Sequence, residues 1–181
     1  MYVDTKQMIA RQLFEMLRHK KLEDVTIKAL VDACHISRQT FYYHFRDLID
    51  VLEWGTGEAV RQDLEASLQA RSQREAIRLF VARVLRNREV TRSLMRSDSR
   101  EQFERIMTDG FRTYLRELFR QKWPDPALPA GDMNALLDFY TFGLMGVILK
   151  YGCAGDVEED VLVDRIDRIV SGEMKRQLTG G

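Results

Sequence analysis

The chain has 181 residues, of which 45% are apolar and 31% charged, so it is long enough to bury a core without disulfides. Its 28 basic and 28 acidic residues give a net charge of zero, and any contact with nucleic acid must therefore depend on a local concentration of basic groups. Three prolines and two cysteines exclude a proline-rich polymer and a disulfide framework.

The sequence carries no pattern typical of secretion or of a membrane span. The first 25 residues are interrupted by charges throughout, which excludes the apolar stretch of a signal peptide. The longest uncharged apolar run covers residues 139–149, shorter than the ~20 residues that a spanning helix needs. We therefore expect a protein of the cytoplasm with no membrane partner.

Helical periodicity dominates the N-terminal part of the chain. Apolar residues recur with helical spacing in the first segment, at Ile9, Leu13, Met16 and Leu17. Asp4 or Thr5 is placed to cap that helix, and three further helices follow good N-caps at Thr26, Ser37 and Asp47. The expected helices cover residues 5–17, 27–34, 37–45 and 48–70, with a polar connection at 19–24 and a joint at 34–36.

The remaining sequence predicts longer helices, over residues 73–88, 90–96, 99–122, 132–151 and 157–178. Residues 123–129 hold all three prolines and are expected to form a loop. No strand and no internal repeat is expected, so the fold class is all-α. We expect a three-helix domain over residues 1–54 and a helical bundle over residues 55–181.

Two short helices joined by a three-residue turn form the pattern of a helix-turn-helix. In the second of them, Phe41 and Phe45 lie four residues apart and point inward with Ile36. Polar side chains of the same helix offer donors for phosphates and base edges: Arg38, Gln39, Thr40, Tyr42, Tyr43 and His44. Partial burial of Tyr43 is the alternative at that position.

The charge around this helix is suited to DNA. No carboxylate occurs between Asp32 and Asp47, whereas Arg38, Arg46 and two of the three histidines fall there. A surface that faces phosphates needs this local absence of negative charge.

Residues 26–31 (TIKALV) and 36–45 (ISRQTFYYHF) resemble the DNA-binding signature of TetR-family transcriptional regulators, over roughly residues 5–55. The resemblance implies an all-helical homodimer that binds a palindrome-like DNA site, with a C-terminal domain for dimerisation and effector binding. By this resemblance Thr40, Tyr42 and His44 contact the phosphate backbone, and Arg38, Gln39 and Tyr43 face the major groove. Thr26 and Ser37 complete the predicted DNA-binding set.

A narrower similarity joins residues 38–42 (RQTFY), 45–47 (FRD) and 52–54 (LEW) to regulators of dihydroxyacetone kinase operons. In that subfamily the C-terminal domain can be addressed by a protein partner related to the kinase subunit. The expected partners are therefore double-stranded DNA, a second copy of the chain, and a small-molecule effector or a protein co-regulator.

Three positions depart from the family pattern. His35 stands in the turn where the family often has Gly, at a position that commonly needs a positive φ. Gln39 replaces a second frequent Gly, so its side chain reaches a base instead of allowing a close backbone approach. Leu48 stands where Lys is usual, which removes one phosphate contact.

The C-terminal helices offer an effector pocket and a dimer interface. Candidate pocket residues are Phe80, Phe103, Met107, Phe111, Tyr114, Tyr140 and Met145, each with membership of an ordinary core as its alternative. The helix over residues 132–151 is apolar nearly all round, with Gly143 and Gly146 allowing close approach of a second helix. Candidate dimer residues are Leu144, Val147, Ile148, Leu162, Ile166 and Ile169, with burial inside one subunit as the alternative.

Two charged stretches leave alternatives open. Residues 71–100 hold nine arginines against three carboxylates, which favours a solvated helix face over a second anion-binding surface. Residues 156–160 (DVEED) are acidic and open a helix, and they are placed to pair with the arginines within or across protomers.

The sequence gives no support to catalysis or to a bound metal. It contains no phosphate-binding loop, no nucleophile elbow and no metal-ligand spacing, and all three histidines lie in the first 44 residues. We expect no enzyme, no cofactor and no metal site. The alternative to a DNA-binding regulator is a protein-interaction adaptor whose helix-turn-helix binds DNA only weakly.

Overall fold

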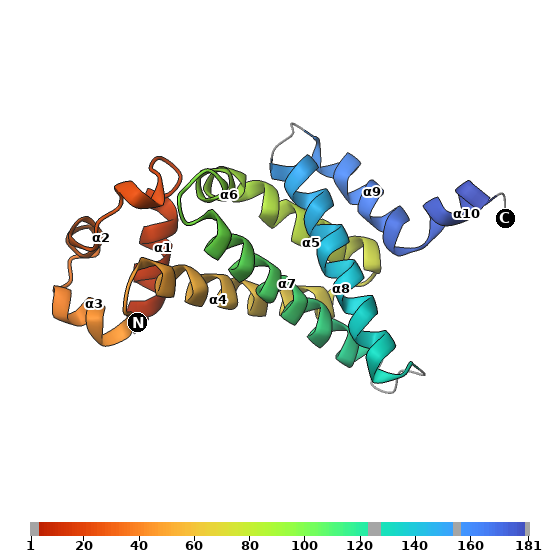
Figure 1. Cartoon of the computed structure of the whole chain (residues 1–181), viewed down its shortest axis with the longest axis horizontal. Helices are drawn as coiled ribbons and strands as arrows, with labels where there is room; N and C mark the ends of the chain where they lie inside the picture. Colours follow the sequence, from red (N-terminus) through yellow and green to blue (C-terminus); the bar gives the residue numbers. More distant parts are fainter. Residues whose placement is uncertain (1–3, 123–127, 154–156, 180–181) are drawn as a thin grey trace. The chain divides into compact units, whose positions relative to one another are not determined.

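The computed structural model describes residues 4–122, 128–153 and 157–179, and this part of the chain is helical with no strand (Figure 1). The expected all-α fold is confirmed. The N-terminal elements are α1 (Thr5–Met16), the 3-10 helix η1 (Leu22–Asp24), α2 (Ile27–Ala33), α3 (Arg38–His44) and α4 (Leu48–Gln69). They are followed by α5 (Gln73–Arg86), α6 (Arg88–Met95), α7 (Arg100–Lys122), α8 (Ala130–Val147), the π-helix η2 (Ile148–Cys153), α9 (Glu159–Val170) and α10 (Glu173–Thr179).

Side-chain caps explain where the first four helices begin. Asp4 accepts a hydrogen bond from the Lys6 N–H at 2.9 Å, Thr26 from Ala29 at 3.1 Å and Ser37 from Thr40 at 3.0 Å. The Asp47 carboxylate accepts from the Asp50 N–H at 2.8 Å in the first turn of α4. Each cap satisfies a backbone donor that the helix itself leaves free.

The structure corrects three of the expected elements. The connection at residues 19–24 contains η1, which buries Leu22. The helix expected over residues 157–178 is two helices, because Gly172 adopts a left-handed backbone with φ of 73° and ends α9. The helix expected over residues 132–151 begins at Ala130 and changes to π geometry from Ile148. Most of the expected proline loop, residues 123–127, lies outside the described residues.

The chain packs as two compact units, residues 1–60 with 89–110 and residues 61–88 with 111–181. This packing division differs from the predicted functional division at residue 54, because α6 and the start of α7 pack with the N-terminal helices. The residues that bring them there are Val90, Leu94, Phe103 and Ile106. The division of functions between residues 1–54 and 55–181 stays a prediction.

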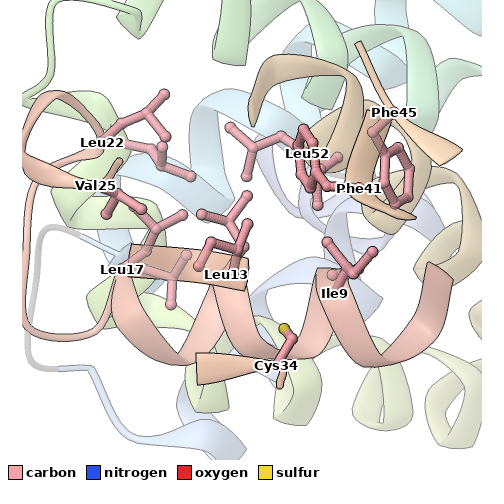
Figure 2. Packing of buried hydrophobic residues seen from close by; sticks show 14 of the residues in the cluster. Ile9, Leu13, Leu17, Leu22, Val25, Cys34, Phe41, Phe45 and Leu52 are labelled. Carbon is pink, nitrogen blue, oxygen red and sulfur yellow. The ribbon is translucent and has the colours of Figure 1, made fainter. Parts of the chain in front are cut away.

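The core of the first unit is formed by the inward faces of α1 to α4. Ile9 and Leu13 of α1 are fully buried, as is Leu17, the residue that caps the C-terminal end of α1. Figure 2 shows Phe41 of α3 beside Leu52 of α4 in the same cluster. Gly55 in α4 leaves room for the neighbouring α1, since a Cβ there would lie 2.5 Å from the ring of Phe14. This core fixes the positions of α2 and α3.

In the second unit α5 packs against α9 and against the π-helix η2. Leu162, Val163 and Ile166 of α9 are buried there, together with Val81 of α5. Gly152 in η2 lies close to α9, because a Cβ at this position would approach the Leu162 side chain to 3.1 Å. The change to π geometry therefore brings Gly152 and Cys153 into the interior.

The segment Ala130–Cys153 is long and apolar enough to cross a membrane, by length and composition alone. Its most apolar window is 39% buried inside the protein, and core helices of soluble proteins meet the same criterion. Leu137, Thr141, Leu144 and Met145 form the buried face of α8. The segment is thus weak evidence for a membrane span.

Candidate nucleic-acid interface and effector cavity

Two phenylalanines hold α3 against the first unit. Phe41 is fully buried and Phe45 nearly so, with their ring centroids 6.1 Å apart. Phe45 also meets Trp54 of α4 edge to face at 6.0 Å, and the ammonium of Lys6 lies over both of these rings. The inward face of α3 is therefore fixed on both sides by aromatic packing.

The opposite face of α3 is open to solvent. Tyr43 is 84% exposed and Tyr42 is 57% exposed, so the alternative of a partly buried Tyr43 is wrong. Arg38 and Gln39 are exposed one turn earlier on the same face. Large exposed aromatic residues flanked by polar donors on a rigid helix are typical of a recognition surface.

The other predicted contact residues lie at the edges of this face. Thr40 and His44 are half-buried, whereas Thr26 and Ser37 are exposed at the starts of α2 and α3. The Ser37 hydroxyl lies 2.8 Å from the Thr40 hydroxyl, so both are held in place by the capping turn. The α3 candidates thus lie on the exposed face of the helix and at its two edges, and Thr26 starts the neighbouring helix.

The turn between α2 and α3 depends on an unusual backbone conformation. His35 has φ of 54°, in the left-handed region that glycine adopts most readily. Its backbone N–H bonds to the Asp32 carbonyl at 3.2 Å, and the Ile36 N–H bonds to the Val31 carbonyl at 3.1 Å. The positive φ expected at this position is confirmed.

Carboxylates next to α3 are occupied by neighbouring groups. The Asp50 carboxylate accepts the Arg46 N–H at 2.9 Å and pairs with its guanidinium at 3.4 Å. The backbone hydrogen bond from Arg46 is the main reason why the pKa of Asp50 is lowered, and the guanidinium adds to this effect. The Asp50 carboxylate therefore binds the turn after α3, through the N–H and the guanidinium of Arg46.

Leu48 contributes to the core instead of to a charged surface. Its side chain is half-buried and packs against the hydrophobic cluster of the first unit. This packing explains why an apolar residue is tolerated where the family usually has Lys.

A cavity of about 420 Å³ lies within the second unit. Four of the seven predicted pocket residues line it, namely Phe80, Phe111, Tyr114 and Tyr140. Phe103 and Met107 belong to the hydrophobic cluster of the first unit, because the early part of α7 packs there. Met145 is buried on α8 but does not line the cavity.

Two neighbouring hydroxyl groups belong to the lining, and a buried ion pair lies close to one of them, Tyr114. The Tyr114 hydroxyl lies 2.8 Å from the Ser67 hydroxyl, and burial raises the pKa of Tyr114. Arg83 of α5 pairs with the buried carboxylate of Asp63 of α4, and burial lowers the pKa of Arg83 to about 10. Tyr114 thus remains a neutral hydroxyl and Arg83 a cation at neutral pH.

Most predicted dimer residues are buried inside a single chain. Leu144, Ile148, Leu162 and Ile166 are at most 7% exposed, so they are corrected to core residues of the second unit. Val147 and Ile169 are half-buried. The alternative of burial within one subunit holds for these four, because α8, η2 and α9 pack their inner faces within the second unit of the same chain.

Sequence reasoning missed two sets of residues. On α8, Phe139 and Phe142 are 70% and 66% exposed, and Gly143 and Gly146 beside them face open space. An all-apolar helix does not show which face its own domain covers, so periodicity gave no signal here. At the cavity the missed polar residues are Ser67, Arg71, Ser72, Gln73 and Lys122, which only the folded chain brings together.

The two charged stretches pair within one chain. Arg74 of α5 lies 3.3 Å from Asp164 and 3.4 Å from Asp167, and Arg78 lies 2.5 Å from Asp160. These pairs lie along the α5–α9 contact at the surface of the second unit. They identify this part of the basic stretch as a paired helix face.

No cluster of three or more His, Cys, Asp or Glu suited to a metal ion occurs among residues 4–122, 128–153 and 157–179. Cys34 and Cys153 are both buried thiols. Cys34 lies in the core of the first unit, where burial raises the pKa of its thiol.

Comparison with known proteins defines the class. Residues 73–172 match a TetR-family model described as "Transcriptional regulator C-terminal region". That match spans more than half of the chain, and the chain therefore belongs to the TetR family of transcriptional regulators. No significant match is found among curated proteins.

Solved structures share the whole fold at low sequence identity. The dihydroxyacetone kinase operon activator DhaS is 15% identical with a TM-score of 0.68, and the similarity covers 96% of this chain and 98% of that one. A transcriptional regulator from Aquifex aeolicus is 15% identical with a TM-score of 0.58, covering 92% and 98%. A TetR-family regulator from Bordetella parapertussis is 18% identical with a TM-score of 0.52, covering 93% and 94%.

Proposed function

We propose that the protein is a sequence-specific DNA-binding regulator that acts as a homodimer on a palindrome-like operator. The observation that supports this most is the division of α3, with Phe41 and Phe45 buried and Tyr42 and Tyr43 strongly exposed. A helix fixed on its inner face keeps its outer side chains in a defined register for base and phosphate contacts. Regulators of the TetR family bind DNA and dimerise.

The residues of α3 divide between two roles. Thr40, Tyr42 and His44 contact phosphates, and Arg38, Gln39 and Tyr43 face base edges in the major groove. Thr26 and Ser37 start α2 and α3 and present their exposed first turns to the DNA backbone. These assignments rest on the resemblance and are supported by the exposure of α3.

The second copy of the chain binds the outer face of α8. Phe139 and Phe142 are apolar and exposed there, and the open space at Gly143 and Gly146 allows close approach of another helix. A palindrome-like operator needs two recognition helices about 34–36 Å apart, which a two-fold dimer supplies. Val147 remains a candidate for this contact, since it is half-buried.

An effector acts at the C-terminal domain. The cavity supports a small molecule, and Ser67 of its lining belongs to α4, the helix that begins directly after the α3 turn. An effector changes DNA affinity only by its different affinity for two arrangements of the dimer. A protein co-regulator is the second candidate, favoured by the fold shared with DhaS and the similarity of residues 38–54 to that subfamily. We place the protein in the cytoplasm, without a cofactor and without catalysis.

Selection of bound fragments from genomic DNA tests the proposal. The full-length protein is expected to enrich fragments that share a two-fold symmetric motif. The adaptor alternative predicts recovery without a common motif, and in that case a pull-down with the full-length protein would identify the partner.

A further inference from the structure

The lining of the second-unit cavity carries positive charge and no negative charge. It includes Arg71 and Lys122 and, among the described residues, no Asp or Glu. This is a local property, since 28 of the 181 residues of the chain are acidic. A cavity with this charge attracts an anion in preference to a cation.

Both cations lie at the rim of the cavity, because their side chains border it and are exposed. Arg71 precedes α5 and Lys122 ends α7. Arg71 bonds to the Glu75 carboxylate through its backbone N–H, at 2.7 Å, so this contact does not use its guanidinium. Within the described residues neither cationic group pairs with a carboxylate, whereas Arg74, outside the lining, pairs with α9.

The apolar part of the lining is formed largely by flat rings. Phe80 and Tyr114 stack at 5.6 Å, and Phe111 and Tyr114 stack at 5.8 Å. Phe119 and Tyr140 meet edge to face at 6.1 Å on the same lining. Rings in these arrangements favour a planar aromatic ligand, which stacks or meets them edge on.

The polar atoms deep in the cavity belong to two neutral hydroxyls. Ser67 and Tyr114 are 2% and 6% exposed, and their hydroxyls bond to each other. Because one hydroxyl donates to the other, a single O–H remains for a ligand, and a carboxylate there would lose its hydration without meeting a cation of the lining. The charged end of a ligand is thus stable only at the rim, beside Arg71 and Lys122.

We propose that the cavity binds an aromatic carboxylate, with its ring against Phe80, Phe111 and Tyr114 and its carboxylate at Arg71 and Lys122. The volume of about 420 Å³ suits a small organic ligand. The proposal rests on the effector role proposed for the cavity and adds the chemical class of the effector.

Calorimetric titration of the full-length protein, without DNA, tests the ligand class with four probes. These are 2-naphthoate, its neutral amide 2-naphthamide, the cation 2-naphthylmethylammonium and the aliphatic acid octanoate. We expect 2-naphthoate to bind at least about 10-fold more tightly than the other three, the difference that one charge-assisted contact provides. Equal affinity for naphthoate and naphthamide, tighter binding of octanoate, or no saturable binding of naphthoate would overturn the proposal.

Variants at the rim test the two cations. Arg71→Gln and Lys122→Met are each expected to weaken naphthoate binding by about 10-fold and to leave naphthamide binding unchanged. Arg116→Gln is the matched control, since Arg116 is exposed on the same helix as Lys122 and lies outside the lining. Unchanged naphthoate affinity in both rim variants, with circular dichroism identical to wild type, would contradict the assignment.

The same probes separate this inference from the effector role on which it rests. If naphthoate binds in the cavity and also shifts operator affinity, both are supported. If it binds with the expected selectivity and operator affinity is unchanged, the ligand class is supported and small-molecule control of DNA binding is overturned.

Discussion

At the scale of single residues, α3 separates positions that hold the helix from positions that we propose read DNA. Phe41 has no exposed surface and its neighbour Tyr42 is mostly exposed, although their rings touch edge to face at 5.4 Å. Substitutions that keep the Phe41–Tyr42 ring contact, such as Tyr42→Phe and Gln39→Ala, should therefore change DNA binding with little change in stability. The two predicted roles on that face differ in what they should do to sequence preference.

Tyr42→Phe is expected to weaken binding by a similar factor, about 3- to 10-fold, on every duplex, because we propose that its hydroxyl contacts a phosphate. Tyr151→Phe, a partly exposed tyrosine of the second unit, is the control. Fluorescence anisotropy measures the affinity of both variants for a selected operator and for an unrelated duplex. Unchanged binding would remove Tyr42 from the contact set.

Gln39→Ala is expected to alter sequence preference, because we propose that Gln39 reads a base edge. Loss of that contact should reduce discrimination at one operator position by about 1–3 kcal/mol. Repeating the selection with the variant measures the change. A motif identical to that of the wild type would contradict the base-reading role.

His35 determines the stability of the turn that positions α3. Because its φ is 54°, a β-branched residue is strained there, and His35→Val should lower the free energy of unfolding by about 1–2 kcal/mol. His35→Gly should retain the wild-type stability, because glycine adopts this conformation without strain. Urea unfolding followed by circular dichroism compares the three proteins, and equal stability of the Val and Gly variants would disagree with the observed turn.

At the scale of elements, helix ends and helix contacts are stabilised by different interactions. The turn from α3 into α4 depends on the Asp50 carboxylate, which accepts the Arg46 N–H. The α5–α9 contact combines buried aliphatic side chains with exposed ion pairs. Exposed pairs contribute little to stability, whereas a buried leucine contributes several kcal/mol.

Asp50 gives the α3–α4 turn a defined dependence on pH. Its pKa is lowered in the folded chain, so its contribution is present above the ordinary value of 3.8 and is lost as pH falls through the lowered value. Asp50→Asn should cost about 0.5–1.5 kcal/mol at pH 6 and progressively less in acid. Urea unfolding at several pH values measures this, and a difference that is independent of pH would exclude the carboxylate as the cause.

On α9, Leu162→Ala should lower the free energy of unfolding by about 2–5 kcal/mol, because Leu162 is fully buried. Arg78→Ala, which removes the exposed pair with Asp160, should cost less than about 1 kcal/mol. Denaturant unfolding of the two variants ranks the interactions. A larger loss in Arg78→Ala would mean that charge, and not burial, holds α5 and α9 together.

At the scale of the whole molecule, the proposed function requires two copies of the chain. Phe142→Asp is expected to prevent dimerisation, because it places a charge on the exposed apolar face of α8. Sedimentation should show monomers and operator affinity should fall by at least about 100-fold, while circular dichroism stays unchanged. A dimeric variant with wild-type DNA affinity would move the interface elsewhere.

The sequence predicted local features well because they depend on neighbouring residues. The N-caps at Thr26 and Ser37, the turn at His35 and the buried Phe41 all follow from spacings of a few residues. The faces of α8 were not predictable, because an all-apolar helix carries no amphipathic signal. A different limit applies to Phe103 and Met107, because the apolar stripe of α7 does not show that its first part packs in one unit and the cavity residues Phe111 and Tyr114 in the other.

The most direct test of sequence-specific recognition is anisotropy titration of a selected operator and a scrambled duplex at several salt concentrations. Recognition by α3 predicts a Kd near ~10⁻⁸ M or tighter for the operator, far weaker binding of the scrambled duplex, and affinities that fall steeply with salt. Equal affinities for the two duplexes across the salt series would contradict the account.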